Sequence, residues 1–520
     1  TQPLPPMSIA CFDVGAVVKG LTAGFTIPRE TPLFAQEPGG LTCRFRTCYD
    51  TMLWPLKVTA ADIEPSEHHG VTSGPAVLRI RLVGRSDLLR DPEFVPSLRF
   101  FIDGPHAVAG AIHELLFAGA IDVRLADKSS AEAVSVGCSS LKMVGFEAGE
   151  EVLPYPGQAL PGYRLIQEYF NFPRKFHFFD VHNLSRRPCA KKDADASDYL
   201  DLLIVLRDTP RPEPAIGPDN FRLGCTPIVN LFQKTAEPIR LDHYNLEYRI
   251  IPDVRREATT EIHSILSVSA SANPQEPAQI YEPFYAFRHS WTGREPQAFW
   301  LARRVAAERP DLRGTDLYLS FIDLGFNPVE PGDHAVFAHS LCTNRWMAHQ
   351  LPDRAVLNIE NAAPVMSIYC LGKPTPPRYP PLGGAALWRL VSSLTLNFVS
   401  LAGEADGLEA LREILRLYAL SESAAVEQEI EGIQEMQVRK VVRHCGEEAW
   451  RGFRRGNEVT FSFDPLKFAG GSALLLANVL RHFLALYSSV NTFTEVVARR
   501  TGFHGEWMRW KPLAGSEVVL

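Results

Sequence analysis

The stretch "ALPGYRLIQEYFNFPRKFHFFDV", residues 159 to 181, decides how we interpret the fold. It holds seven aromatic residues, two prolines and four basic side chains if His177 is counted. Pro161 suits the first turn of a helix. Pro173 ends that helix, because the residue before a proline avoids the α region. The pattern therefore predicts a helix between the two prolines, followed by a strand over 175 to 181.

Such aromatic density is typical of a sugar-binding platform, a surface that stacks nucleic-acid bases, or a core between two lobes. Alternation around Phe176 and Phe178 favours the core, because it puts one face of the strand inside. We therefore expect the stretch to join one lobe to the next by burying its aromatic rings. The residues that we single out as its structural signature are Tyr163, Phe170, Phe172, Phe176 and Phe179.

Length and composition indicate a soluble globular protein of about three domains, because 520 residues exceed what one core can serve. The 40 prolines fit many short strands better than a helical bundle. A net charge of -7 gives no electrostatic case for nucleic acid as the main partner.

The nine cysteines include no CxxC pair, which predicts free thiols in a reducing compartment. Cys43 and Cys48 could pair or ligate a metal, but no second Cys/His pair at zinc spacing follows. The chain starts without a signal-peptide pattern. Its most apolar run, residues 473 to 480, is stopped by Arg481 and His482 and is too short to span a membrane. We therefore expect an intracellular protein that is not inserted in a membrane.

The fold class that these patterns predict is α+β, β-rich and multidomain. A first lobe over 1–182 carries one β–α–β segment (97 to 127) and the aromatic helix–strand connector. A second β-rich lobe covers 183–370, and a Pro/Gly linker covers 371–384. A C-terminal α+β domain over 385–520 follows, in which strands at 456 to 464 and 491 to 499 lie beside each other and pack on a helix at 472 to 490.

Recognisable catalytic motifs are absent, so we predict no catalytic, cofactor-binding or metal-binding residue and no enzymatic activity. Two alternatives stay open. One is a multidomain carbohydrate-active enzyme whose carboxylates meet only in the fold. The other is a β-sandwich binding module, which needs an exposed aromatic platform. Trp507 and Trp510 either anchor a partner or cap the last domain's core.

Segments along nearly the whole chain resemble the TssF family, also called VasA or ImpG, of the type VI secretion system baseplate. The aromatic stretch from Pro161 is the longest of them. The others, in the same order as in the family, are "GFTIPRETPLF" (24 to 34), "CRFRTCYDTMLWPL" (43 to 56), "LRFFIDG" (98 to 104), "CTPIVNLFQKTAEPIRLDH" (225 to 243), "LCTNRW" (341 to 346), "LWRLVSSLTLNFVSL" (387 to 401), "LREILRLY" (411 to 418) and "LRHFLALYSSVNTFTEV" (480 to 496).

This resemblance implies a structural role like that of the wedge proteins of contractile phage baseplates. The expected partners are TssG, with two TssF copies to one TssG, and then TssE and TssK. The wedges would surround a VgrG hub and hold the contractile sheath indirectly. The implied place is the cytoplasm, in a baseplate docked near the inner membrane. Family members usually carry a helical segment before the Pro-rich "QPLPP", where this chain starts.

Overall fold

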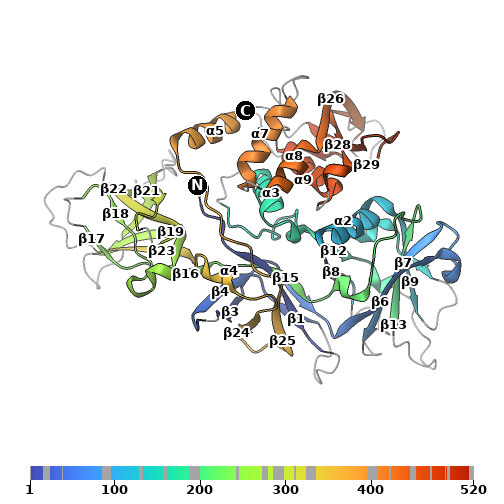
Figure 1. Cartoon of the computed structure of the whole chain (residues 1–520), viewed down its shortest axis with the longest axis horizontal. Coiled ribbons are helices and arrows are strands. Elements are labelled where there is room, and N and C mark those ends of the chain that lie inside the picture. Colours follow the sequence, from blue (N-terminus) through green and yellow to red (C-terminus); the bar gives the residue numbers. More distant parts are fainter. Residues whose placement is uncertain are drawn as a thin grey trace.

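The computed structural model describes most of the chain, with gaps. The described residues are 2–15, 24–37, 39–84, 95–127, 133–155, 161–186, 199–241, 245–271, 279–284, 298–309, 312–323, 335–395, 407–420, 423–444, 453–468, 471–486, 488 and 492–514. Figure 1 shows a strand-rich molecule in which several sheets surround a central helix, α3 (Pro161–Asn171). The predicted class, α+β and β-rich with several sheets, is confirmed.

A closed barrel lies at the lower centre of Figure 1. Its strands come from the start, the middle and the late part of the chain. In barrel order they are β1 (Met7–Asp13), β15 (Cys225–Val229), β4 (Thr42–Thr47), β3 (Pro32–Gln36), β24 (Val356–Ile359) and β25 (Ser367–Leu371). A small ribbon, β2 (Phe25–Ile27) with β5 (Thr51–Leu53), lies beside this part of the chain.

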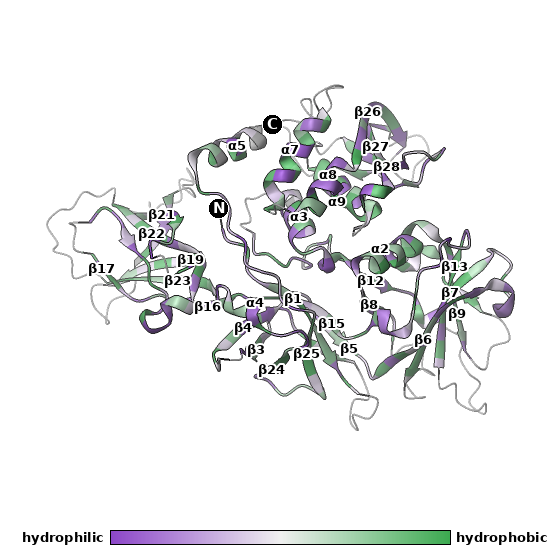
Figure 2. Cartoon of the chain, in the orientation of Figure 1, coloured by the Kyte–Doolittle hydropathy of each residue, from purple (hydrophilic) through white to green (hydrophobic). Residues whose placement is uncertain are grey.

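Two sheets and a helix form the right-hand part of Figure 1. The first sheet runs β10 (Val134–Ser135), β9 (Ala120–Asp127), β13 (Tyr199–Leu206), β7 (Ala76–Gly84) and β6 (Leu56–Pro65). The second runs β11 (Leu141–Met143), β12 (Phe178–Val181), β8 (Leu98–Ile102) and β14 (Phe221–Arg222). Helix α2 (His106–Glu114) and the π-helical turn η2 (Leu115–Gly119) link the two sheets. Figure 2 shows the hydrophobic residues along α2 and its neighbouring strands.

The left-hand lobe is an 8-stranded sheet. Its order is β16 (Phe232–Thr235), β23 (Ala335–Thr343), β19 (Glu261–Ser271), β20 (Gln279–Pro283), β21 (Ala298–Ala306), β22 (Thr315–Asp323) and β18 (Tyr248–Arg249), with β17 (Ile239–Arg240) paired to β23. The short helix α4 (Met347–Gln350) leads from this sheet back to the barrel.

The C-terminal domain packs helices on one sheet, as predicted. Parallel pairing of β27 (Phe453–Phe463) with β28 (Phe493–Arg500) confirms that these two strands lie side by side. The chain connects these two strands through α9 (Ala473–Ala485), whose side chains are mostly buried. The remaining elements are α5 (Gly384–Thr395), α7 (Gly407–Ala419), α8 (Ala424–Glu431), β26 (Ile433–His444), β29 (Met508–Arg509) and β30 (Leu513–Ala514).

The sheets differ from the predicted order of lobes in two ways. The elements of the β–α–β segment form, but β8 and β9 belong to different sheets, so the helix bridges sheets and does not cross over within one. Strands on both sides of residue 183 also share sheets: β13 pairs with β7 and β9, and β15 pairs with β1. Backbone pairing over such distances cannot be read from local patterns. Whether the four predicted ranges are the limits of domains stays a prediction.

The predicted linker at 371–384 is held against the N-terminal segment. The Thr375 amide donates to the Met7 carbonyl at 2.8 Å, and the Arg378 amide donates to the Leu4 carbonyl at 3.1 Å. The Arg378 guanidinium also donates to Asn171 on α3 at 3.1 Å. These hydrogen bonds tie the start of the chain, the linker and the connector helix together.

Candidate partner interface

The aromatic stretch is where three hydrophobic cores of the chain meet. Tyr163 and Phe170 of α3, with Phe176, lie in the core of the C-terminal domain. Phe172 belongs to the cluster that covers the outside of the barrel. Phe179 belongs to the core of the right-hand sheets. All five signature residues are therefore buried, and each lies in a core between structural units.

The rings of the stretch contact elements far away in the sequence. Tyr163 meets Phe483 of α9 edge to face, with ring centroids 5.1 Å apart, and meets Tyr418 of α7 at 4.9 Å. Phe179 of β12 stacks on Phe100 of β8 at 5.1 Å. Aromatic pairs of this kind contribute about 0.5–1.5 kcal/mol beyond the burial of their area. The connector therefore attaches the C-terminal domain to the rest of the chain.

A buried ion pair closes the connector between its helix and its strand. The ammonium of Lys175 contacts the carboxylate of Glu168, and both side chains are fully buried. Glu168 also accepts hydrogen bonds from the amides of Val152 and Leu153, each at 2.9 Å. Burial lowers the pKa of Lys175, and the attraction of Glu168 opposes that change. Removing either partner would leave the other as an unpaired buried charge, which destabilises the folded state.

These contacts decide between the interpretations of the stretch. A sugar-binding or base-stacking platform needs exposed ring faces, and the seven aromatic rings between 163 and 179 are all buried. The alternative of a binding module built on this stretch is therefore wrong.

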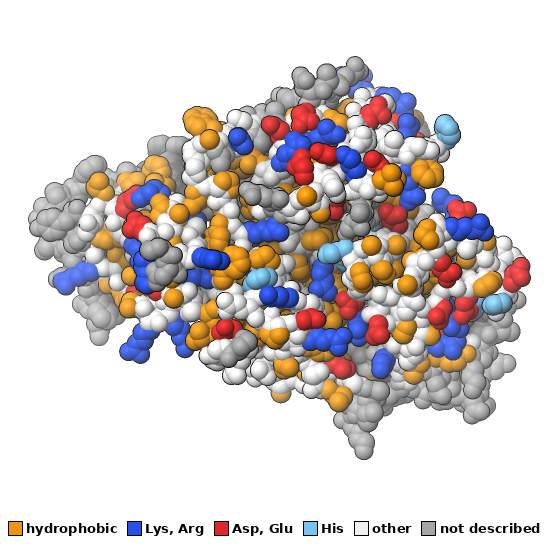
Figure 3. Space-filling view, in the orientation of Figure 1, with side chains coloured by type: hydrophobic (Ala, Val, Ile, Leu, Met, Phe, Trp, Pro, Cys, Tyr) orange, Lys and Arg blue, Asp and Glu red, His pale blue; other side chains and the backbone are white. Residues whose placement is uncertain are grey.

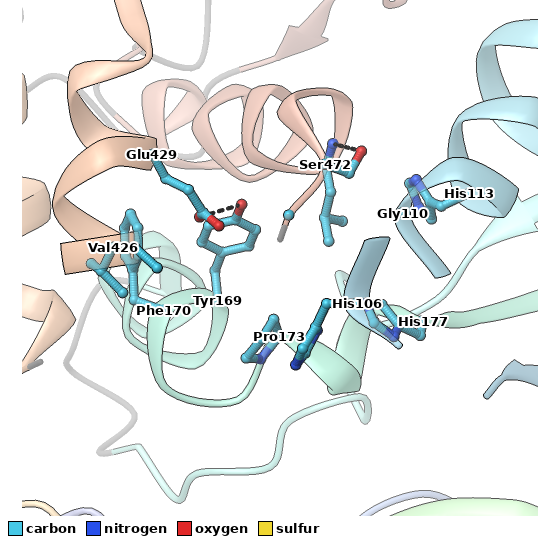
Figure 4. Close-up of a pocket in the computed structure, with 13 residues that line it drawn as sticks. His106, Gly110, His113, Tyr169, Phe170, Pro173, His177, Val426, Glu429 and Ser472 are labelled. Carbon is cyan, nitrogen blue, oxygen red and sulfur yellow. Dashed lines mark hydrogen bonds between the residues drawn. The ribbon is translucent and has the colours of Figure 1, made fainter. Parts of the chain in front are cut away.

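A cavity of about 240 Å³ lies where α2, α3, α8 and α9 come together (Figure 4). Figure 4 shows Glu429 pointing toward Tyr169, whose hydroxyl donates to that carboxylate at 3.2 Å. Burial raises the pKa of Glu429 to about 6. Burial lowers the pKa of His113 to about 4 and that of His177 well below its usual range. The lining also includes His106, Gly110, Phe170, Pro173, Ala425, Val426, Gly471, Ser472 and Leu475.

The chemistry of this cavity does not match a glycosidase. Among the described residues that line it, Glu429 is the one carboxylate, whereas glycosidases use two. Both ring nitrogens of His113 lack a hydrogen-bond partner among the described residues. With three imidazoles whose pKa values burial lowers and several apolar side chains around one carboxylate, the cavity is a joint between the connector, α2 and the C-terminal domain.

Two carboxylates, Glu458 and Glu495, lie side by side on β27 and β28. Arg439 contacts Glu458 at 2.6 Å, and Arg509 contacts Glu495 at 3.0 Å. Burial acts to raise the pKa of Glu458, but hydrogen bonds from Arg509 and Arg439 outweigh it, so that pKa is lowered. Both carboxylates are held by arginines, and this is typical of an ion-pair network that stabilises a sheet.

The two C-terminal tryptophans pack against the C-terminal core. Trp510 is 7% exposed and belongs to that core. Trp507 is partly buried against it, and the guanidinium of Arg500 lies 3.9 Å from its ring centroid. This geometry favours the core-capping alternative for Trp510. A partner contact through Trp507 stays a prediction.

Helix α5 presents apolar side chains to solvent. Leu387, Trp388 and Val391 are 42%, 73% and 49% exposed. Figure 1 shows α5 at the upper edge of the molecule, apart from the neighbouring sheets, and Figure 3 shows hydrophobic side chains at that place on the surface. Large exposed apolar side chains that lie together on a monomer mark interaction sites.

The sequence patterns did not indicate that α5 is exposed. The signal that could have revealed it is composition: "GAALWRLVSSLT" carries Arg389 as its one charged residue. A helix with an apolar stripe typically packs that stripe against the core of its own chain. A helix whose apolar stripe stays exposed within its own chain indicates a partner.

Clusters of metal-ligating side chains and membrane-spanning helices were sought among the residues that the structure describes. No group of three or more His, Cys, Asp or Glu side chains there could hold a metal ion. Cys43 and Cys48 are buried free thiols and belong to different hydrophobic clusters. Among the described helices, none has the length and the hydropathy that a membrane crossing requires.

The comparisons with known proteins agree along the whole chain. The family model "Type VI secretion system, TssF" matches residues 1–517. The chain is 32% identical over 543 residues to the type VI secretion system component TssF1 of Pseudomonas aeruginosa (strain PAO1), and the match covers 100% of this chain and 86% of that protein.

Two solved structures share the fold. One is a cryo-electron microscopy structure of the type VI secretion system TssK-TssF-TssG baseplate subcomplex. A chain of it matches with a TM-score of 0.77 and 24% identity, over 99% of this chain and 92% of that one. The other is the baseplate complex from the type VI secretion system, with a TM-score of 0.60 and 18% identity, over 100% of this chain and 86% of that one.

The family model spans nearly every residue, and the identity to TssF1 extends over the full chain. The predicted resemblance is confirmed: this chain belongs to the TssF family of the type VI secretion system.

Proposed function

We propose that this chain works as a structural subunit of a type VI secretion baseplate and acts by holding neighbouring subunits. The observation that carries the proposal is the family match over residues 1–517. The fold supports it, because its cores serve to join sheets, and the cavity and the carboxylate pair described above lack the features of a hydrolytic centre. The matches with known proteins do not support the alternative of a carbohydrate-active enzyme, so we do not propose it.

The partners that we propose are a TssG and a TssK protein, as in the solved subcomplex with the same fold. Beyond them we propose two copies of this chain per TssG, contact with TssE, and assembly around a VgrG hub that holds the sheath indirectly. The place that we propose is the cytoplasmic side of the inner membrane. These finer statements come from the family resemblance.

Helix α5 is the surface that we propose for the contact with TssG. Its exposed apolar residues, Leu387, Trp388 and Val391, follow the linker that is tied to the N-terminal segment. A tryptophan flanked by aliphatic side chains is typical of an interface hot spot. Packing against an apolar surface of TssG would cover α5 with little loss of backbone conformational entropy, because the helix is already formed.

Co-expression with TssG and TssK from the same genome tests the subunit role. We expect the full chain to co-elute with them as one complex in size-exclusion chromatography with light scattering, at two copies per TssG. A chain that stays monomeric with TssG, TssK and TssE would contradict the proposal.

A double variant, Leu387→Ser with Trp388→Ser, tests the surface. We expect at least a tenfold weaker affinity for TssG with an unchanged melting temperature. The matched control is Leu466→Ser, because Leu466 is 88% exposed and lies outside α5. If the control and the double variant bind TssG equally well, the contact lies elsewhere.

A further inference from the structure

Three residues form a row across neighbouring strands of the barrel. Cys11 of β1 is directly opposite Cys225 of β15 and directly opposite Tyr369 of β25. In an antiparallel ladder, hydrogen-bonded and non-hydrogen-bonded pairs alternate. The Phe12 amide donates to the Gly224 carbonyl at 2.9 Å, so the neighbouring pair of cysteines occupies a non-hydrogen-bonded position.

That position brings the two cysteine side chains close together. Opposite residues of a non-hydrogen-bonded pair have their Cα atoms about 4.5 Å apart, with side chains on the same face of the sheet. This separation lies within the range of roughly 4.4–6.8 Å that disulfides occupy. A bond between the two sulfurs therefore needs little movement of the backbone.

The pair faces outward from the barrel. Cys11 and Cys225 belong to the cluster that contains Phe172 and Phe178 of the connector. Cys370, one residue after Tyr369, belongs to the cluster inside the barrel. Successive side chains of a strand point to opposite faces, which explains this difference. The two thiols thus lie at the joint between the barrel and the aromatic connector.

The surroundings of the two sulfurs make them unequal. Hydrogen bonds from Cys225 and Tyr369 to the sulfur of Cys11 outweigh its burial and lower the pKa of the Cys11 thiol, and Arg222 adds to the effect. Burial raises the pKa of the Cys225 thiol well above its usual range. Cys225 can also donate to the Leu223 carbonyl, 3.7 Å away. This is the arrangement of an attacking thiolate beside a resolving thiol.

A small oxidant has a path to the Cys225 side of the pair. Each cysteine is only 4% exposed, but Gly224 and Cys225 line a cavity of about 210 Å³. That cavity also has Asp50 and Arg99 in its lining, so its wall includes polar groups. Hydrogen peroxide is small and polar enough to enter such a space.

We propose that Cys11 and Cys225 are an oxidisable dithiol that hydrogen peroxide converts to a disulfide between β1 and β15. The Cys11 thiolate attacks one peroxide oxygen, the O–O bond breaks and hydroxide leaves, which gives a sulfenic acid. The Cys225 sulfur then attacks the Cys11 sulfur. Its proton and the sulfenic hydroxyl leave as water, and the S–S bond forms. In total, two thiols lose two hydrogens and one peroxide becomes two waters. This site is independent of the proposed assembly role.

The test uses the purified full chain, treated with hydrogen peroxide, blocked at its free thiols, digested and examined by mass spectrometry. We expect one cross-linked peptide pair that contains Cys11 and Cys225, and we expect dithiothreitol to separate it. Cys225→Ser should abolish the cross-link and leave Cys11 as a sulfenic acid that dimedone traps. Cys11→Ser should abolish both products. Cys370→Ser is the matched control, from which we expect an unchanged cross-link.

Tyr369→Phe tests the role of the tyrosine. It removes one hydrogen bond to the thiolate, worth about 1 kcal/mol, so we expect cross-linking about fivefold slower with the same product. The proposal is overturned if both cysteines stay reduced while the exposed Cys138 is oxidised, or if either forms its disulfide with another cysteine. An unchanged rate in Tyr369→Phe would overturn the assignment of Cys11 as the attacking thiolate.

Discussion

Helices α3 and α5 have 11 and 12 residues, and both carry an apolar stripe, but they differ in burial. Helix α3 contains Arg164, Gln167 and Glu168 and is nonetheless packed into the C-terminal core. Helix α5 has one charged residue and exposes Leu387 and Trp388. Apolar content alone therefore does not say which helix is covered by its own chain. The difference is whether the fold supplies a neighbour: α7 and α9 lie against α3, whereas Leu387 and Trp388 of α5 face solvent.

The largest effect should come from breaking the charge pair that anchors α3. In Lys175→Met the carboxylate of Glu168 stays buried without its cation, and we expect a loss of about 3–5 kcal/mol in the free energy of unfolding. Urea denaturation measures it. The double variant Glu168→Gln with Lys175→Met should recover most of the loss, because neither side chain of the pair then carries a charge. A single variant within about 1 kcal/mol of the parent would show that the pair does not hold the connector.

A ring deletion on α3 should cost nearly as much. Phe170→Ala removes a buried side chain from the C-terminal core, and we expect a destabilisation of about 3–5 kcal/mol. The matched control on α5 is Val391→Ala, expected within about 0.5 kcal/mol because Val391 is half exposed. Equal effects of the two variants in urea denaturation would erase the distinction between the helices.

Glu429, which touches α3 through Tyr169, should give a smaller effect that depends on pH. Burial raises its pKa from the usual 4.5 to about 6. The folded state therefore binds the proton more tightly than the unfolded state does. The stabilising contribution of that proton is complete below pH 4.5 and is lost as the pH rises through 6.

We therefore expect Glu429→Gln to be more stable than the parent above pH 6, by about 1–2 kcal/mol, with the difference changing between pH 4.5 and 6. Urea denaturation over pH 4 to 8 measures the difference. His113 and His177, whose pKa values burial lowers, act with the opposite sign in both proteins, so they cancel in the comparison. A difference that does not vary with pH would show that Glu429 does not titrate in this range.

The smallest effect on stability should come from α5. We expect Trp388→Ser to change the free energy of unfolding by no more than about 0.5 kcal/mol, because its side chain is 73% exposed. Thermal unfolding of the isolated chain measures it. A loss above 2 kcal/mol would mean that α5 already has a neighbour within this chain.

The amino-acid sequence by itself determined the local elements and the family. Pro161 and Pro173 set the limits of α3, because a helix end depends on neighbouring residues. The predicted strand over 175 to 181 is right only from Phe178, because Pro173–Phe176 form a 3-10 turn, and the rings of Phe178 and Phe179 are both buried. Long ordered motifs pointed to the TssF family. Tertiary structure decided what no local pattern holds: that β1 pairs with β15 and β25, that β8 and β9 enter different sheets, and that α5 stays exposed. Those outcomes depend on which distant surfaces meet, and a periodicity of two or 3.6 residues fixes which face of an element is apolar but not what covers it.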